Sequence, residues 1–380
     1  MPATTTPAEL AALLDADADA TILDTRPPES FDAWHLPGAV NVPYKPNQPF
    51  PGDALPDDLD TTDRVLTVCA KGTSSRFLAD ELESAGYRDV SVVAGGMRGW
   101  SAVYETVPVV ARSDLEIVQV QRRAKGCLGY VVADPRSGDA AAVDPTRHTE
   151  RFRAVAESRG YELVRVLDTH VHADHVSGGR RLADDLGVPY HLGANARERD
   201  VAYEYDAIER NDTVSVGDVS VKAVPTPGHT TDLTSYLVDD AAVLTGDALF
   251  VDSVGRTELE FGDADADRGA RLQHGSLHRT LLALPDSVTV LPGHASVAAD
   301  GTWTPTPPGH PVKSRLGALR DRLPLLSLSE DAFVERLTAS APAKPPNYER
   351  VIDINRGREE PETETELTEL ELGPNNCAID

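Results

Sequence analysis

The feature that most limits how this chain can fold lies near its middle, where four potential metal ligands fall within six residues. An apolar strand pattern over Leu163–Asp168 runs into His170, His172, Asp174 and His175. Alternate side chains of an extended segment point the same way, so His170 and His172 share a face. Imidazole and carboxylate groups at this density are typical of a metal site. The fold must therefore bring this strand end to a metal-binding edge.

Three later segments add ligand residues in the same way, each at a strand end beside glycine, where backbone can approach a metal closely. They supply His229 in Pro227–Thr230, Asp247 after Leu244–Gly246, and His294 after Pro292–Gly293. This ordered set resembles the metallo-β-lactamase fold over about residues 115–300. The resemblance implies an αββα sandwich with its metal site at the edge of the two sheets.

The ligand types leave the metal open. The candidate ligands could hold two zinc ions that activate a bridging hydroxide, as in glyoxalase II, a thioester hydrolase that the sequence resembles. The alternative is one iron in a site of two histidines and one carboxylate, with open positions for substrate and dioxygen.

Further segments resemble persulfide dioxygenases: Cys127–Tyr130, Asp144–Pro145, Thr245–Phe250 and Gly255–Thr257. This resemblance implies one Fe(II) per chain, held by His170, His229 and Asp247. The other cluster residues then orient ligands and order water, or hold a second metal, and two of them are assigned catalytic roles as well. They are His172 and His294, with Asp174 and His175 as the catalytic pair.

Two positions concern the substrate. Arg256 is expected to bind a substrate carboxylate through two of its guanidinium nitrogens. His294 is followed by Ala295 and Ser296, where glutathione-using members often have Asp-Tyr. The thiol that carries the persulfide therefore stays open, with coenzyme A among the candidates.

A second site is indicated by Cys69, which follows the buried-strand pattern Arg64–Val68 and precedes a loop that enters a helix. Backbone N–H groups of such a loop and the helix N-terminus favour a thiolate, which is the nucleophilic form. On these residues alone, a small buried cysteine ending a strand fits as well.

The surrounding motifs favour chemistry at Cys69. Over about residues 6–105 the chain resembles a single-domain rhodanese, because four motifs occur in order: Asp24–Phe31, His35–Pro43, the Cys69 loop and Gly95–Trp100. The resemblance implies a sulfurtransferase in which Cys69 carries a persulfide. Gly72, Thr73 and Ser74 are expected to bind the substrate, and Arg76 to act in catalysis.

The predicted class is α/β, with two domains and a tail. Residues 1–112 form a rhodanese-like domain with a parallel sheet, and residues 113–300 form the metallo-β-lactamase sandwich. Residues 301–356 are a helical C-terminal extension, and residues 357–380 are an acidic, mobile tail.

The charge and composition of the chain limit the kinds of molecule that it can bind. The formal charge of −26 is spread along the chain, which we interpret as adaptation to a salty, halophile-type cytoplasm. So negative a surface makes nucleic acid a poor partner. No apolar run approaches the length of a membrane span, and the first twenty residues lack Lys and Arg. We therefore expect a cytoplasmic protein without a membrane partner; homo-oligomerisation stays open.

Together these observations predict an Fe(II)-dependent persulfide dioxygenase. It would oxidise a low-molecular-weight thiol persulfide with O₂ to sulfite, coupled to sulfur transfer through Cys69. The alternative is a dinuclear zinc thioester hydrolase of the glyoxalase II type with an accessory rhodanese domain.

Overall fold

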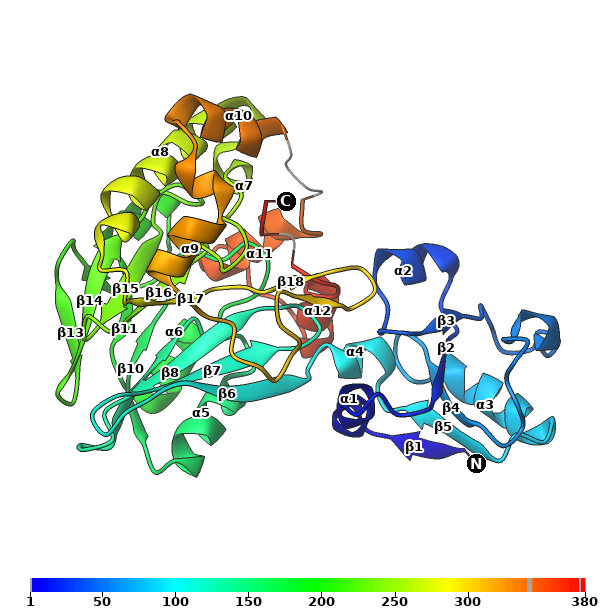
Figure 1. Cartoon of the computed structure of the whole chain (residues 1–380). Helices are drawn as coiled ribbons and strands as arrows, with labels where there is room; N and C mark the ends of the chain where they lie inside the picture. Colours follow the sequence, from blue (N-terminus) through cyan, green and yellow to red (C-terminus); the bar gives the residue numbers. More distant parts are fainter. Residues whose placement is uncertain (1, 340–343, 376, 380) are drawn as a thin grey trace.

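The N-terminal part of the computed structural model is a three-layer α/β unit (Figure 1). The structure describes residues 2–339, 344–375 and 377–379. Five parallel strands form a sheet of order β1-β5-β4-β2-β3. The strands are β1 (Ala3–Thr5), β2 (Thr21–Asp24), β3 (Val40–Asn41), β4 (Arg64–Val68) and β5 (Asp89–Val93). The helices are α1 (Pro7–Asp15), α2 (Pro28–Ala33), α3 (Ser74–Ser84) and α4 (Gly96–Trp100), with a 3₁₀ turn at Gly52–Ala54.

The first helix shows how local sequence sets an element. Thr6 accepts a hydrogen bond from the Glu9 backbone N–H, and the Glu9 carboxylate accepts one from the Thr6 N–H. This reciprocal capping and Pro7 at the first helical position fix where α1 begins. The helix then buries Leu10 and Ala11 against the sheet.

The larger part is a sandwich of two mixed sheets with helices outside. One sheet has the order β12-β11-β10-β9-β8-β7-β6, the other β13-β14-β15-β16-β17-β20. The strands of the first sheet are β6 (Tyr104–Ala111), β7 (Glu116–Arg122), β8 (Leu128–Ala133), β9 (Asp139–Val143), β10 (Glu162–Leu167), β11 (Tyr190–Gly193) and β12 (Asp206–Ile208). Those of the second are β13 (Thr213–Val216), β14 (Val219–Pro225), β15 (Thr234–Val238), β16 (Ala242–Gly246), β17 (Thr289–Pro292) and β20 (Ser314–Arg315). A short ribbon pairs β18 (Ser296–Val297) with β19 (Trp303–Thr304).

Helices cover both outer faces of the sandwich and form the C-terminal extension. They are α5 (Thr149–Ser158), α6 (Gly179–Leu186), α7 (Glu258–Phe261), α8 (Ala266–Arg279), α9 (Leu316–Arg322), α10 (Glu330–Ala339), α11 (Tyr348–Asn355) and α12 (Glu364–Leu370). The predicted fold class is confirmed by this arrangement.

The core lies between the two sheets, and strand β8 shows how it is built. Successive side chains of a strand point to opposite faces. Tyr130 and Val132 face the second sheet and join the central cluster, whereas Val131 and Ala133 face α5 and α6. All of β8 is buried for this reason. A strand buried on both faces reads as a continuous apolar run, as expected beneath covering helices.

The junction between the domains differs from the expected division at residue 112. Strand β6 pairs antiparallel with β7, so the first sheet of the sandwich already begins at Tyr104. The charged residues Arg112 and Asp114 form an ion pair in the turn between these two strands. The first domain therefore passes directly into an edge strand of the second.

The acidic tail is packed in the structure, so the prediction of a mobile segment is wrong for the described residues of 357–380. Helix α12 buries Leu370, and the carboxylate of Glu371, with no exposed surface, forms ion pairs with Arg122 and Arg147. Cys377 and Ile379 are also buried. The composition is that of a solvated segment, but these buried partners anchor it to the sandwich.

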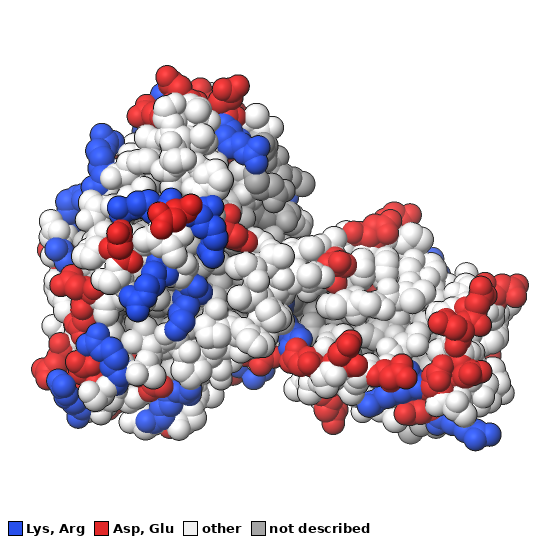
Figure 2. Space-filling model, in the orientation of Figure 1, with Lys and Arg blue, Asp and Glu red and all other residues white. Residues whose placement is uncertain are grey.

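The surface shows the excess of acidic residues inferred from composition. Figure 2 shows acidic side chains over both domains on this face, with basic side chains mostly over the larger one. Among the described residues, no helix is long and apolar enough to cross a membrane.

Candidate metal centre and sulfur-transfer loop

The predicted metal ligands come from the ends of different strands. His170 follows β10, His229 follows β14, and Asp247 directly follows β16. Their close approach needs glycine: a Cβ atom on Gly293 would lie 2.5 Å from Asp247 Oδ1. The sandwich thus gathers residues far apart in the sequence at one sheet edge.

His170, His229 and Asp247 form one cluster. Each offers a ligand atom, and these atoms lie within 4.8 Å of one another; all three side chains are buried. His170 Nε2 and Asp247 Oδ2 have no hydrogen-bond partner among the residues that the structure describes. A buried polar atom without a partner is costly, and a bound cation removes that cost.

Neighbouring groups fix which nitrogen of each histidine carries a lone pair. Thr169 donates its hydroxyl to Asp144, so its oxygen accepts from His170 Nδ1–H at 2.9 Å. His229 Nδ1–H donates to the carbonyl oxygen of Arg256 at 2.6 Å. Both rings therefore present Nε2 as a lone-pair donor, the form that ligates metals.

Protonation supports the same assignment. Burial lowers the pKa of His170 well below its usual range, and repulsion from His172 and His229 lowers it further. For Asp247, burial raises the pKa, but His294 and His229 lower it more, so the carboxyl is ionised. Neutral imidazole and ionised carboxylate are the forms that bind a divalent cation.

The remaining ligand candidates are engaged with one another. His294 donates from Nδ1 to Asp247 Oδ1 at 2.7 Å and from Nε2 to Asp174 Oδ2 at 2.9 Å. The other oxygen of Asp174 lies 3.0 Å from His175 Nδ1. Burial lowers the pKa of His294, but Asp247 and Asp174 outweigh this effect and raise the pKa well above its usual range. Both ring nitrogens of His294 are thus directed at carboxylate oxygens.

The ring of His172 lies next to the rings of His170 and His175. Its Nε2–H donates to Asp144 Oδ1 at 3.3 Å, and its Nδ1 has no partner within the described part of the chain. The ring stands 4.2 Å from that of His170, centroid to centroid. His172 is thus placed to contact a group bound beside His170.

Cys69 occupies the loop between β4 and α3. Its sulfur accepts hydrogen bonds from the Gly72 backbone N–H at 3.1 Å and from the Ser75 hydroxyl at 3.4 Å. Burial raises the pKa of this thiol, but hydrogen bonds from Ser74, Ser75 and Lys71 N–H outweigh it and lower the pKa. The loop therefore stabilises a thiolate, as the sequence predicted.

A cavity of about 450 Å³ lies beside this loop and can receive a substrate. Ala70 and Ser74 line it, together with Lys45, Glu29 and Arg26, whose guanidinium is paired with Asp24 at 2.6 Å. Of these charges, the Lys45 ammonium suits an anionic sulfur compound. Arg76, expected to be catalytic, is half-buried on α3 outside the lining of this cavity. The lining also omits Gly72 and Thr73, although Gly72 donates to the Cys69 sulfur.

Comparison with known families agrees with this geometry. Residues 6–103 match the rhodanese-like domain family, and residues 123–294 match the metallo-beta-lactamase superfamily. The chain belongs to the metallo-beta-lactamase superfamily and carries an N-terminal rhodanese-like domain. Its buried histidine and aspartate clusters are typical of that superfamily's metal sites.

Individual relatives of the metallo-beta-lactamase domain carry different activities in their names. An uncharacterized protein, ML0493, of Mycobacterium leprae is 32% identical over 46% of this chain and 89% of its own length. A hydroxyacylglutathione hydrolase of Polaromonas is 29% identical over 57% and 88%. A mitochondrial persulfide dioxygenase, ETHE1, of Bos taurus is 29% identical over 43% and 62%.

Solved structures agree with the fold. The crystal structure of ETHE1 from Myxococcus xanthus superposes with a TM-score of 0.54 at 26% identity, covering 63% of this chain and 96% of its own. A metallo-beta-lactamase from Staphylococcus aureus gives 0.58 at 24% identity, covering 65% and 73%. The family is thus one of hydrolases and dioxygenases.

Arg256 has a different setting in the metallo-beta-lactamase domain from the one expected. Its guanidinium has no exposed surface, and its Nε donates to Glu258 Oε1 at 2.6 Å. A substrate carboxylate would have to compete with this internal ion pair. The backbone oxygen of Arg256, however, holds His229 in the ligating tautomer.

Three contributors to the metal centre were missed by sequence reasoning. Cys127 lies with Asp174, His175 and His294, and Cys377 lies with Asp247 and His294, within 4.8 Å in each case. Asn355 of α11 donates its side-chain amide to the backbone oxygens of His172 and His175 at 2.8 Å each. The apolar Cys-Ala-Ile ending of an otherwise acidic tail was the signal that could have shown its burial.

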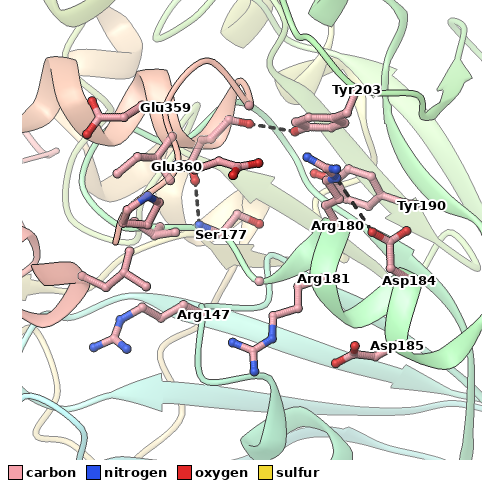
Figure 3. Close-up of a pocket in the computed structure, with 17 residues that line it drawn as sticks. Arg147, Ser177, Arg180, Arg181, Asp184, Asp185, Tyr190, Tyr203, Glu359 and Glu360 are labelled. Carbon is pink, nitrogen blue, oxygen red and sulfur yellow. Dashed lines mark hydrogen bonds and ion pairs between the residues drawn. The ribbon is translucent and has the colours of Figure 1, made fainter. Parts of the chain in front are cut away.

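A hollow of about 510 Å³ lies where α6 meets the C-terminal extension. In Figure 3, Arg147 and Arg181 lie on one side of it and Glu359 and Glu360 on another. Its lining includes none of His170, His229 and Asp247. The hollow is therefore separate from the metal cluster.

Proposed function

We propose that this protein is an Fe(II)-dependent persulfide dioxygenase whose rhodanese-like domain transfers sulfane sulfur through Cys69. The observation that carries the proposal is the contrast between two sets of ligands. His170 and His229 have free lone pairs close to Asp247, whereas both nitrogens of His294 are hydrogen-bonded to the carboxylates of Asp247 and Asp174. This favours one metal held by two histidines and a carboxylate, the set used by mononuclear iron oxygenases.

In this proposal His170, His229 and Asp247 hold the iron, which supplies the dioxygen chemistry when bound. The overall reaction is RSSH + O₂ + H₂O → RSH + SO₃²⁻ + 2H⁺. Thr169 and the Arg256 carbonyl keep the two imidazoles in their ligating tautomers. The Asp174 carboxylate accepts from His294 and lies beside His175, and these two imidazoles are placed to exchange protons with substrate or product.

Cys69 has its own step. Its thiolate accepts a sulfane sulfur, and Lys45 of the adjacent cavity attracts the donor or acceptor anion. The sulfur then passes either to sulfite, which gives thiosulfate, or toward the metal centre as persulfide. The fusion of both activities in one chain supports a shared sulfur substrate.

The experiment is oxygen uptake with a low-molecular-weight persulfide, at high salt, on protein whose iron and zinc have been counted. We expect uptake in proportion to iron, near one per chain, and its loss in His229→Ala. His310→Ala removes an exposed imidazole and should retain uptake. No uptake by iron-replete protein would refute the proposal.

A dinuclear zinc thioester hydrolase is the second candidate, favoured by the presence of Asp174, His175 and His294 beside the first cluster. The similar hydroxyacylglutathione hydrolase of Polaromonas supports it too. It predicts about two zinc ions per chain, thioester hydrolysis and no oxygen uptake.

A further inference from the structure

Cys127 is a buried thiol that the reaction proposed above does not use. It follows the turn after β7 and pairs as an isolated antiparallel bridge with His294. Its sulfur donates to Asp174 Oδ2 at 3.3 Å and lies 3.7 Å from His175 Nδ1. Only 1% of the side chain is exposed.

The groups around Cys127 form the arrangement of an activated nucleophile. Asp174 accepts the thiol proton through one oxygen and orients His175 through the other. A nucleophile next to a base, with a third group holding the geometry, is the usual signature of covalent catalysis. His175 also keeps its Nε2 without a hydrogen-bond partner in the described residues, although the ring is buried. A buried ring nitrogen without a partner indicates a group bound beside this histidine.

We propose that Cys127 is a second acceptor of sulfane sulfur, placed in the ligand cluster of the metal domain. The inference rests on the proposed function, because the donor is the persulfide substrate. Cys127–SH and R–S–SH give Cys127–S–SH and R–SH. The sulfur of Cys127 bonds to the terminal sulfur of the donor, the donor S–S bond breaks, and the thiol proton passes through Asp174 to the departing RS⁻. No external oxidant or reductant is needed.

Access to Cys127 depends on the C-terminal segment. Asn375 packs on the preceding residue, Gly126, where an added Cβ would lie 2.7 Å from its side-chain nitrogen. The Asn375 side chain donates to the backbone oxygens of Lys125 and Ala295, and its backbone N–H donates to Lys125 O at 3.0 Å. We therefore expect the Cys127 sulfur to become more accessible when these contacts of Asn375 are removed.

The test is a mass measurement on the full chain. The protein is incubated without oxygen with glutathione persulfide, freed of excess reagent, alkylated and digested after Lys and Arg. This digestion puts Cys69, Cys127 and Cys377 on three different peptides. Cys377 is the matched control, because it is a second thiol of the same centre with the same 1% exposure.

We expect one added sulfur on Cys69 and on Cys127, and none on Cys377. Asn375→Ala should speed the modification of Cys127 several-fold and leave that of Cys69 unchanged. Labelling of Cys69 with none on Cys127, or equal labelling of Cys127 and Cys377, would overturn the inference.

Admitting oxygen afterwards separates this inference from the proposed function. Loss of the added sulfur from Cys127 with release of sulfite supports both. A Cys127 persulfide that persists in oxygen leaves the acceptor site supported, and absence of oxygen uptake when iron-replete protein is given fresh glutathione persulfide refutes the dioxygenase. Oxygen uptake by a wild-type protein that never carries sulfur on Cys127 supports the dioxygenase and refutes Cys127 as a sulfur acceptor.

Discussion

Replacing Glu371 by glutamine would remove the negative charge that faces Arg122 and Arg147 inside the metallo-beta-lactamase domain. The Glu371 carboxylate lies 2.9 Å from Arg122 and 2.7 Å from Arg147, and it accepts the Val176 backbone N–H at 2.7 Å. Arg122 and Glu371 have no exposed surface. Glutamine keeps the shape but replaces one of the two accepting oxygens by an NH₂ donor, so the substitution removes the charge and one accepted hydrogen bond.

The magnitude follows from the pKa of Glu371. Burial raises it, but Arg122 and Arg147 lower it from the ordinary 4.5 to about 2. Such a change corresponds to about 3 kcal/mol of favourable interaction. Leaving two buried cations without their partner costs about 3–5 kcal/mol, which agrees. We therefore expect Glu371→Gln to lower the free energy of unfolding by about 3 kcal/mol at pH 7.

The dependence on pH gives a second check. A carboxyl whose pKa is lowered by folding stabilises the protein above its unfolded pKa and loses that contribution as pH falls through the folded value. The difference between wild type and variant should be full above pH 4.5 and shrink toward pH 2.

The assay is urea unfolding at high salt, with wild type, Glu371→Gln and the matched control Glu364→Gln compared. Glu364 also pairs with Arg147, but its side chain is 69% exposed, so its loss should matter little. Equal, small effects of the two substitutions would show that the buried ion pair does not anchor the tail.

Three further predictions concern the rhodanese-like domain. Thr6→Ala removes the cap of α1 and should cost about 1 kcal/mol of stability in chemical unfolding; an unchanged midpoint would contradict the capping role. Because its pKa is lowered, Cys69 should react with iodoacetamide at half its maximal rate at a pH below that of free cysteine, and Ser75→Ala should raise that pH; a profile unmoved by the substitution would argue against these hydrogen bonds. A Cβ on Gly96 would overlap the Cys69 carbonyl oxygen, so Gly96→Ala should abolish sulfur transfer measured as thiosulfate formation, whereas full activity would mean that the loop adapts.

Sequence reasoning recovered what is encoded locally. The strand before His170 and the glycines beside Asp247 and His294 placed the ligands at strand ends, and the structure brings them together there. The loop around Cys69 was similarly readable because its glycine and hydroxyl residues follow within a few positions. In both sites, chemistry and backbone geometry are determined by neighbouring residues.

The remainder depends on contacts between distant parts of the chain. Arg122 lies in a strand but finds Glu371 in the tail, and Cys127 contacts Asp174 across the sheet edge. Neither pairing leaves a periodic or local signal. The acidic composition of the tail predicted a mobile segment. Composition reflects the average polarity of a segment and does not reveal the few residues that are buried.

The anchoring of Glu371 has a consequence for synthesis. A chain leaves the ribosome from its N-terminus, and domains fold in that order. The rhodanese-like domain can be complete early, whereas Arg122 and Arg147 wait for a partner that emerges more than two hundred residues later. Until then, these two cations lack both the carboxylate and the tail that covers them in the finished fold. The packing around Arg122 and Arg147 is thus completed only after the tail has been made.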